Sequence, residues 1–152
     1  MTLVFAYGPE TLQARMYDRI GPTDVLGPAI LEGYRLVFNK PNHKDKDEGL
    51  ANLEPKDGES VFGVVYDLKP AQATLLEGFF GGYENRNLRV AILDLENPET
   101  RIMKSATVYL ARRTKAGLLP SPANVTATRK GMEENGAEPR FLEALSEYES
   151  KA

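Results

Sequence analysis

The sequence of 152 residues contains no cysteine, no tryptophan and only one histidine. Without cysteine there is no disulfide framework, no thiolate nucleophile and no metal site built on cysteine ligands. One histidine cannot form a histidine-rich metal centre, and we predict neither a metal nor a cofactor. His43 stands in the charged run from Lys40 to Glu48, which is typical of a solvated loop, so a serine–histidine–aspartate triad is disfavoured.

Positive charge is scarce as well. The 19 Lys and Arg residues face 22 Asp and Glu residues, which gives a formal net charge of −3. Because no long basic run is present to neutralise a phosphate backbone, we predict no nucleic-acid partner. The apolar segment from Leu3 to Tyr7 is too short for a signal sequence or a membrane span, and no cationic segment precedes it. We therefore expect a cytoplasmic protein with no membrane partner.

Length and an even composition predict one domain that covers residues 1–152. Apolar runs predict strands at residues 2–7, 30–38, 61–66, 88–95 and 101–110, with a short apolar piece at 50–53. Turns are predicted at Asp57-Gly58, as a hairpin, and at Asn97-Pro98. Helical signals predict helices at 10–20 and 71–77, a third from Pro122 to near Gly136, and a last one with an apolar stripe of Phe141, Leu142, Leu145 and Tyr148. This order indicates an α+β fold.

The first candidate for a functional site is the segment Tyr7-Gly8-Pro9-Glu10. Here a buried strand passes through a glycine turn into a helix, and backbone N–H groups in such a turn can converge on an anion. Proline at the first helical position and glutamate in the first turn are also ordinary helix-start residues. The segment is therefore either a ligand-binding turn or a plain helix start.

The second candidate is Glu77, which precedes the flexible aromatic loop 78–83. A carboxylate at a helix C-terminus faces the negative end of the helix dipole, which destabilises its charged form. Such a group suits a general base that works near neutral pH. The alternative is a solvated glutamate at a frayed helix end.

Six segments occur in one order at compatible spacings. They are Phe5-Ala6-Tyr7-Gly8, Gly33-Tyr34-Arg35-Leu36, Gly49-Leu50-Ala51-Asn52-Leu53, Val61-Phe62-Gly63-Val64-Val65-Tyr66, Leu76-Glu77-Gly78 with Tyr83, and Thr107-Val108-Tyr109-Leu110. Together they resemble the γ-glutamylcyclotransferase family, from its opening signature through its catalytic Glu-Gly element to its last barrel strand. The segment from Pro120 to Leu145 is similar to the C-terminal helices of the full-length cyclotransferases.

The resemblance implies a small mixed β-barrel of about five to six strands with flanking helices. It also implies an enzyme that converts a γ-glutamyl amino acid or amine to 5-oxoproline and the free amino acid or amine, a reaction type of glutathione metabolism. The substrate's own α-amine attacks its γ-carbonyl, so the reaction needs no protein nucleophile, metal or cofactor. The implied partner is a small γ-glutamyl molecule, and the implied assembly is a monomer or homodimer.

Roles for individual residues follow from the same resemblance. Glu77 would be the general acid/base, which takes a proton from the α-ammonium and returns it to the leaving nitrogen. Backbone amides around Gly8 would hold the oxyanion or the substrate carboxylate. The aromatic residues Tyr7, Tyr83 and Tyr109 would fix the reactive rotamer. The pocket would lie between the first turn and the Glu77 loop.

The chain departs from the family pattern at Pro9-Glu10, where the family has Ser-Asn. Proline removes one backbone N–H, and Glu10 adds a negative charge beside the expected anion. The loop from Glu77 to Tyr83 is also about one residue shorter than in familiar members. These departures leave open a non-catalytic small-molecule binding or regulatory protein, and a further alternative is a γ-glutamyl enzyme that acts on a carrier-bound or secondary-metabolite substrate.

Overall fold

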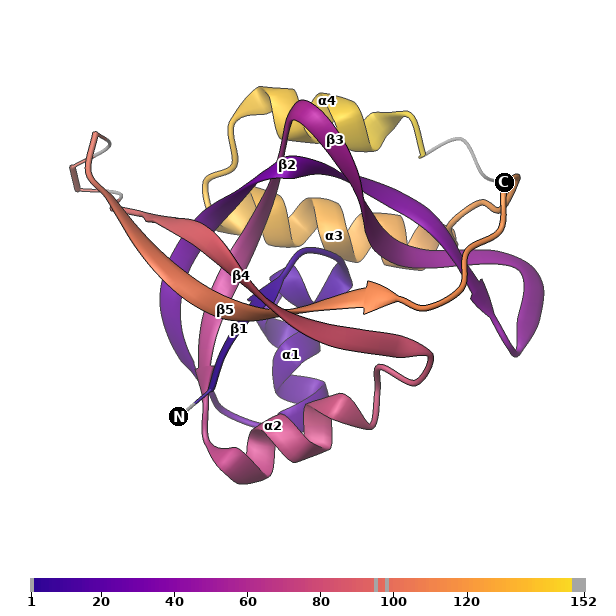
Figure 1. Ribbon diagram of the computed structural model, residues 1–152, viewed down its shortest axis with the longest axis horizontal. Coiled ribbons are helices and arrows are strands. Elements are labelled where there is room, and N and C mark those ends of the chain that lie inside the picture. Colours follow the sequence, from indigo (N-terminus) through magenta and orange to yellow (C-terminus); the bar gives the residue numbers. More distant parts are fainter. Residues whose placement is uncertain (1, 95, 98, 149–152) are drawn as a thin grey trace.

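Five strands close into a barrel in the computed structural model, which describes residues 2–94, 96, 97 and 99–148. The strands are β1 (Thr2–Ala6), β2 (Asp24–Asn42), β3 (Asp45–Leu68), β4 (Tyr83–Leu93) and β5 (Arg101–Ala111). Their order around the barrel is β1-β3-β2-β4-β5. All pairings are antiparallel except that of β1 with β5, so the barrel is mixed. The α+β fold with a small mixed barrel and flanking helices is confirmed (Figure 1).

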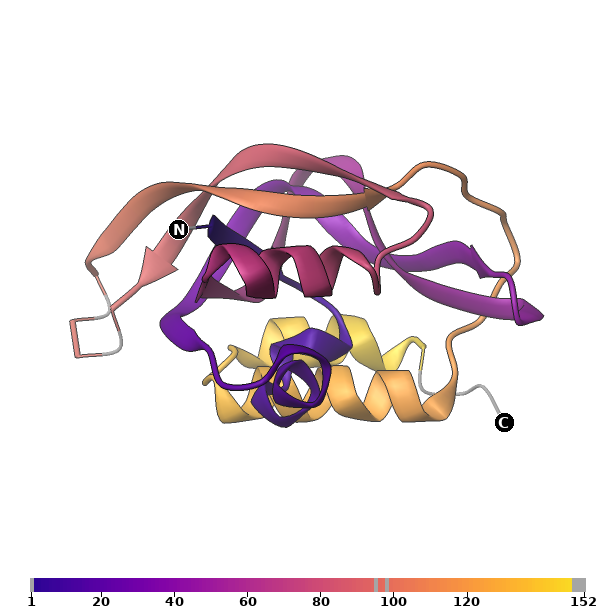
Figure 2. The same ribbon diagram turned by 90° about the horizontal axis from the view of Figure 1, so that it is seen from below.

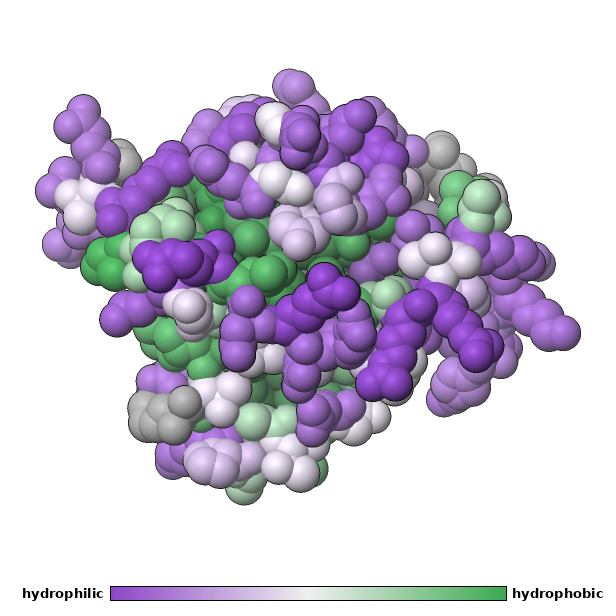
Figure 3. Space-filling view, in the orientation of Figure 1, coloured by the Kyte–Doolittle hydropathy of each residue, from purple (hydrophilic) through white to green (hydrophobic). Residues whose placement is uncertain are grey.

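Helical segments flank this barrel. They are η1 (Pro9–Thr11), α1 (Gln13–Ile20), α2 (Pro70–Glu77), α3 (Pro122–Glu134) and α4 (Pro139–Ser146). The helices α1, α3 and α4 lie on one side of the barrel, and the β4–β5 ribbon lies on the opposite side (Figure 2). Polar and charged side chains cover much of the face that carries this ribbon (Figure 3). Within the described ranges, no helix is long and apolar enough to cross a membrane.

β1 has both faces buried, which explains its continuous apolar sequence. Phe5 packs in the barrel interior with residues such as Leu31 and Val65. Its neighbours Val4 and Ala6 point the other way and pack under α1 with Met16. Since successive strand side chains face opposite sides, a strand covered on both sides reads as an unbroken apolar run.

The predicted loop at residues 40–48 is wrong, because this segment is the tip of a long hairpin between β2 and β3. Asn42 pairs with Asp45 and Pro41 with Gly49, and the turn itself is His43-Lys44. The tip projects away from the barrel (Figure 1). Residues 43–47 at this tip are exposed, so the hairpin carries charges there that predict a loop.

The predicted hairpin turn at Asp57-Gly58 is also wrong. The segments before and after it both pair with β2, since Pro55 lies opposite Tyr34 and Ser60 lies opposite Glu32. The extra residues of β3 between these pairs form an irregular bulge, in which Gly58 has φ of +84°. A bulge bends a strand without reversing it. The predicted apolar piece at 50–53 and the strand at 61–66 are therefore parts of one strand.

The predicted helix at residues 10–20 is divided. The short helix η1 ends at Thr11, Leu12 has an extended ψ of 117°, and α1 begins at Gln13. Met16 and Ile20, one turn apart on α1, are buried. Another predicted strand, 88–95, begins earlier, at Tyr83, while its end at residue 95 and the proline of the Asn97-Pro98 turn lie outside the described residues.

Candidate active site

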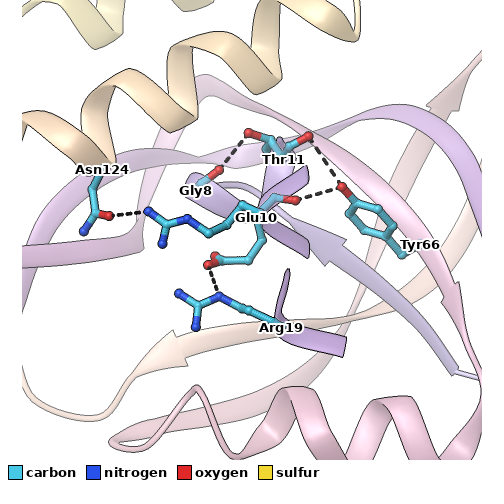
Figure 4. A network of polar contacts seen from close by, with 7 residues as sticks. Gly8, Glu10, Thr11, Arg19, Tyr66 and Asn124 are labelled. Atoms are coloured by element: carbon cyan, nitrogen blue, oxygen red, sulfur yellow. Dashed lines mark hydrogen bonds and ion pairs between the residues drawn. The ribbon is translucent and has the colours of Figure 1, made fainter. Parts of the chain in front are cut away.

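The turn that follows β1 is held by hydrogen bonds from three directions. The Thr11 hydroxyl donates to the Gly8 carbonyl at 2.7 Å, and the Tyr66 hydroxyl of β3 donates to the Glu10 carbonyl at 2.8 Å (Figure 4). From α3, the Asn135 side chain at the C-cap donates to the Thr11 carbonyl at 3.2 Å. The turn is thereby fixed to both the barrel and α3.

A cavity of about 80 Å³ lies between this turn and the loop after α2. Its walls include six of the residues predicted to form a site: Tyr7, Gly8, Pro9, Glu10, Tyr83 and Tyr109. The turn comes from the N-terminus, while Tyr83 begins β4 and Tyr109 lies near the end of β5. Barrel closure therefore brings together residues that are a hundred positions apart in the chain.

The tyrosines of the cavity are held in place by main-chain acceptors. The Tyr7 hydroxyl donates to the Tyr109 carbonyl at 2.6 Å, and the Tyr83 hydroxyl donates to the Ala51 carbonyl at 2.6 Å. Burial raises the pKa of both Tyr7 and Tyr83 above its ordinary value of 10.0. These hydroxyls are therefore neutral donors at physiological pH, and their directions are fixed.

Phe80, from the loop after α2, forms an aromatic wall with two of these tyrosines. Its ring stacks on Tyr109 with centroids 4.4 Å apart, and it meets Tyr83 edge-on at 5.2 Å. The Tyr109 hydroxyl has no hydrogen-bond partner among the described residues. Burial, and then the nearby Glu77 carboxylate, raise the pKa of Tyr109. This hydroxyl is therefore a donor available to a ligand.

Glu77 is the predicted site residue that does not line the cavity. It is the last residue of α2 and is exposed, and its carboxylate accepts a hydrogen bond from the Asn85 side chain at 3.2 Å. Its chain neighbours Leu76 and Phe79 do line the cavity. Glu77 thus stands beside the cavity wall, and its catalytic role stays a prediction.

The negative charge of Glu10, expected to stand beside the anion site, is neutralised by Arg19. The Glu10 side chain is 10% exposed, and its Oε2 accepts a hydrogen bond from Arg19 Nε at 3.0 Å (Figure 4). Both residues line the cavity, and the Arg19 guanidinium lies 4.6 Å from the centre of the Phe79 ring. Glu10, which departs from the family pattern, is therefore one partner of an ion pair.

Arg19, Phe80 and Asn124 also line the cavity, and sequence reasoning did not assign them to the site. Arg19 is nine positions after Glu10 in the chain, across the break between η1 and α1, so no helical spacing predicts their contact. Asn124 comes from α3 and accepts a hydrogen bond from Arg15 at 2.9 Å. An aromatic loop was visible in the sequence, but its contact with β5 was not.

No cluster of three or more potential metal ligands occurs in the part of the chain that the structure describes. His43 lies at the tip of the β2–β3 hairpin and is not a cavity residue. The side chains that surround the cavity are aromatic rings, aliphatic groups such as Met16 and Leu76, the Glu10–Arg19 ion pair and the Asn124 amide. They can orient a small polar molecule through hydrogen bonds and exclude water from it.

Comparison with known proteins gives a consistent picture. The chain superimposes on a solved γ-glutamyl cyclotransferase with a TM-score of 0.86 at 23% identity, over 99% of this chain and 89% of that one. An uncharacterized protein from Homo sapiens gives a TM-score of 0.81 at 24% identity, over 99% and 89%. YkqA from Bacillus subtilis gives 0.78 at 21%, over 99% of this chain and 54% of YkqA. These likenesses show a shared fold.

A comparison of sequence alone reaches the family. No curated protein sequence matches the chain. A family model described as "Gamma-glutamyl cyclotransferase, AIG2-like" matches residues 4–127, a range that includes the turn after β1, the Glu77 segment and β5. The chain belongs to the γ-glutamyl cyclotransferase, AIG2-like family.

Proposed function

We propose that this protein is a γ-glutamylcyclotransferase that acts on a γ-glutamyl amino acid or amine. The observation that carries the proposal is the single cavity shared by the turn after β1, Tyr83 and Tyr109, in a chain of this family. Such a site suits a reaction in which the substrate supplies its own nucleophile. The enzyme then has to hold the substrate curled, and a well-oriented intramolecular attack supplies several kcal/mol of the barrier.

The proposed reaction is an internal transfer that consumes no water. The substrate's α-ammonium loses a proton, its nitrogen forms a bond to the γ-carbonyl carbon, and the amide bond to the leaving group breaks. The attacking nitrogen loses a second proton as the lactam forms, and both protons go to the leaving nitrogen, so the products are 5-oxoproline and a free amine or amino acid. A base that later acts as an acid and a set of oxyanion donors are sufficient for this chemistry.

Backbone donors for the oxyanion are available in the turn after β1. Among the described residues, no backbone acceptor is recorded for the N–H groups of Gly8 and Glu10, and both residues line the cavity. Pro9, between them, has no N–H. We propose that Gly8 and Glu10 supply the donors that Pro9 cannot, and that the Tyr109 hydroxyl contributes a side-chain donor.

Glu77 is the proposed general acid/base. It lies between Leu76 and Phe79, both of which line the cavity, and its carboxylate is close enough to raise the pKa of Tyr109. The role requires the carboxylate to exchange its hydrogen bond with Asn85 for one with the substrate's α-ammonium. An exposed side chain at a helix end changes rotamer at little cost.

A second candidate function is the binding of a small molecule without turnover. The exposed position of Glu77, outside the cavity lining, favours this alternative, as does the N–H that Pro9 lacks. A protein that only binds would still be stabilised by its ligand in proportion to RT ln(1 + [L]/Kd), but would leave that ligand chemically intact.

The experiment incubates the protein with γ-glutamyl amino acids, γ-glutamylamines and glutathione, and measures 5-oxoproline. We expect turnover of at least one substrate and a loss of about 10²- to 10⁴-fold in kcat for Glu77→Gln. Glu84→Gln is the matched control, because Glu84 is a neighbouring glutamate that pairs with Arg86 and does not line the cavity. Full activity of Glu77→Gln, or no 5-oxoproline from any substrate, would contradict the proposal. Ligand-induced thermal stabilisation without product would favour the binding protein.

A further inference from the structure

Arg19 is held rigidly at the edge of the cavity. Its Nε donates to Glu10 at 3.0 Å, and its guanidinium lies 4.6 Å from the centre of the Phe79 ring. Contact with a carboxylate at one edge and an aromatic face on one side fixes the plane of the group. A guanidinium fixed in this way loses little conformational entropy when it binds a further ligand.

The terminal nitrogens of Arg19 remain available. Glu10 occupies the Nε–H, and no acceptor is recorded for the Nη groups among the residues that the structure describes. The side chain is 24% exposed and lines the cavity, so it faces both the interior and solvent. Parallel N–H groups of arginine match the two oxygens of a carboxylate, which makes a carboxylate the ligand that this position fits.

The size of the cavity indicates which part of a substrate reaches Arg19. At about 80 Å³, it is well below the roughly 300–1,000 Å³ of pockets that enclose a whole ligand. In the proposed reaction the curled γ-glutamyl group occupies the interior, so the leaving group extends to the mouth. Arg19 and the half-exposed Phe79 lie there.

We propose that Arg19 is a specificity-determining residue that binds the carboxylate of the amino acid released from the γ-glutamyl group. This inference rests on the proposed function and states which leaving groups the site accepts. γ-Glutamyl amino acids react faster than comparable γ-glutamylamines, because the amine portion has no carboxylate to accept hydrogen bonds from the Arg19 guanidinium. A site built to hydrogen-bond one group discriminates strongly against an analogue that lacks it.

The Glu10–Arg19 pair uses only Nε, so the preference for a carboxylate rests on the Nη groups that the pair leaves as donors. Glu10 cancels the charge of Arg19 in the free protein, so the pair costs little to keep partly buried. A carboxylate that binds at Nη leaves Glu10 on Nε and gains a charge-assisted hydrogen bond. A leaving group that carries an ammonium in place of the carboxylate has no oxygen to accept hydrogen bonds from the Nη groups.

The experiment compares γ-glutamylalanine with γ-glutamylethylamine, which differ only in the carboxylate of the leaving group. We expect kcat/KM for 5-oxoproline formation to be about 10- to 100-fold higher for γ-glutamylalanine, mainly through KM. In Arg19→Met this ratio falls to within about threefold of one. Arg89→Met is the control, since Arg89 is exposed on β4 and does not line the cavity, and it keeps the wild-type ratio.

Two further measurements separate specificity from folding. The double variant Glu10→Gln, Arg19→Met leaves no unpaired carboxylate and is expected to show the same collapsed ratio as Arg19→Met. Calorimetric binding of both substrates to Glu77→Gln measures the preference without turnover.

Each outcome has a distinct meaning. Equal kcat/KM of the wild type for both substrates overturns the role of Arg19 while the proposed function stands, as does an unchanged ratio in Arg19→Met. Absence of 5-oxoproline from these two substrates and from every other substrate of the panel overturns the proposed function. In that case tighter calorimetric binding of γ-glutamylalanine, lost in Arg19→Met, still supports the carboxylate site, and equal binding overturns it.

Discussion

Gly131 of α3 lies directly against Thr11 of the turn that forms the cavity wall. A Cβ atom on Gly131 would stand 2.1 Å from the Thr11 hydroxyl oxygen and 2.4 Å from the main-chain nitrogen of Leu12. These separations are far shorter than van der Waals contact, so only glycine allows α3 to approach so closely. The position of the turn after β1 thus depends on a residue more than a hundred positions away.

Gly131→Ala is expected to lower the free energy of unfolding by about 1–3 kcal/mol, because α3 or the turn has to move to admit the methyl group. Urea denaturation measures this change. Gly81→Ala is the control, since a Cβ there meets nothing within 4 Å and the backbone has no positive φ; we expect no loss of stability. Equal stability of Gly131→Ala and the wild type would show that α3 or the turn can shift to admit the methyl group at no cost in stability.

Tyr66→Phe is expected to cost about 1–3 kcal/mol of stability. Tyr66 is fully buried, and its hydroxyl donates to the Glu10 carbonyl at 2.8 Å, so the variant leaves that carbonyl without its donor. The control is Tyr17→Phe, because Tyr17 is 58% exposed and water replaces any bond that its hydroxyl loses. If chemical denaturation gives the same value for both variants, the bond does not stabilise the turn.

Glu10→Gln is expected to lower the free energy of unfolding by about 1–3 kcal/mol, because Arg19 loses a charged acceptor in a partly buried position. Glu54→Gln tests the same change in the exposed pair with Arg35, whose side chains are 35% and 46% exposed, and we expect less than about 1 kcal/mol there. Denaturation of both variants at low and high salt provides the measurement. A smaller effect at Glu10 than at Glu54 would contradict the prediction.

Stability is expected to fall at alkaline pH because of the buried tyrosines. Burial raises the pKa of Tyr7, Tyr66 and Tyr83 above the ordinary value of 10.0. Below about pH 9 these groups are neutral in both states and have no effect on the pH dependence. Above pH 10 the unfolded chain releases protons that the folded chain retains, so unfolding becomes more favourable as pH rises.

The measurement is a spectrophotometric titration of phenolate in native and denatured protein, together with melting temperatures over the same pH range. We expect the native protein to ionise fewer tyrosines than the denatured one at a pH just above 10, and to melt at a lower temperature there. Coincident titration curves while the protein remains folded would show that the three hydroxyls are accessible.

Local sequence was sufficient to predict an element where its burial and its ends are decided within one segment. The apolar run before Gly8 predicts a strand buried on both faces, and β1 is such a strand. The helix predicted at 71–77 is α2, and the helix predicted from Pro122 is α3, which begins after Ser121, whose hydroxyl oxygen accepts a hydrogen bond from the Asn124 N–H. The turn at Tyr7–Glu10 was recognisable because its glycine, proline and strand end are adjacent in the chain.

Local sequence was insufficient where the partner of a segment decides its structure. The charges of residues 40–48 are compatible with a loop or with a projecting hairpin, and the pairing of Asn42 with Asp45 decides for the hairpin. Asp57-Gly58 is a hairpin signal by type, but both flanking segments pair with β2 instead of with each other. A turn motif favours a local backbone conformation, but it does not determine which strand the flanking segments pair with.

The sequence by itself determined the composition of the cavity's first wall, with Tyr7, Gly8, Pro9 and Glu10 in a turn after a buried strand. Only the tertiary structure decided the environment of that wall. Barrel closure sets Tyr109 beside it, the packing of α1 brings Arg19 to Glu10, and the loop after α2 stacks Phe80 on Tyr109. Strand and helix periodicities extend over a few residues, whereas these contacts join segments whose separation in the chain has no fixed relation to their distance in space.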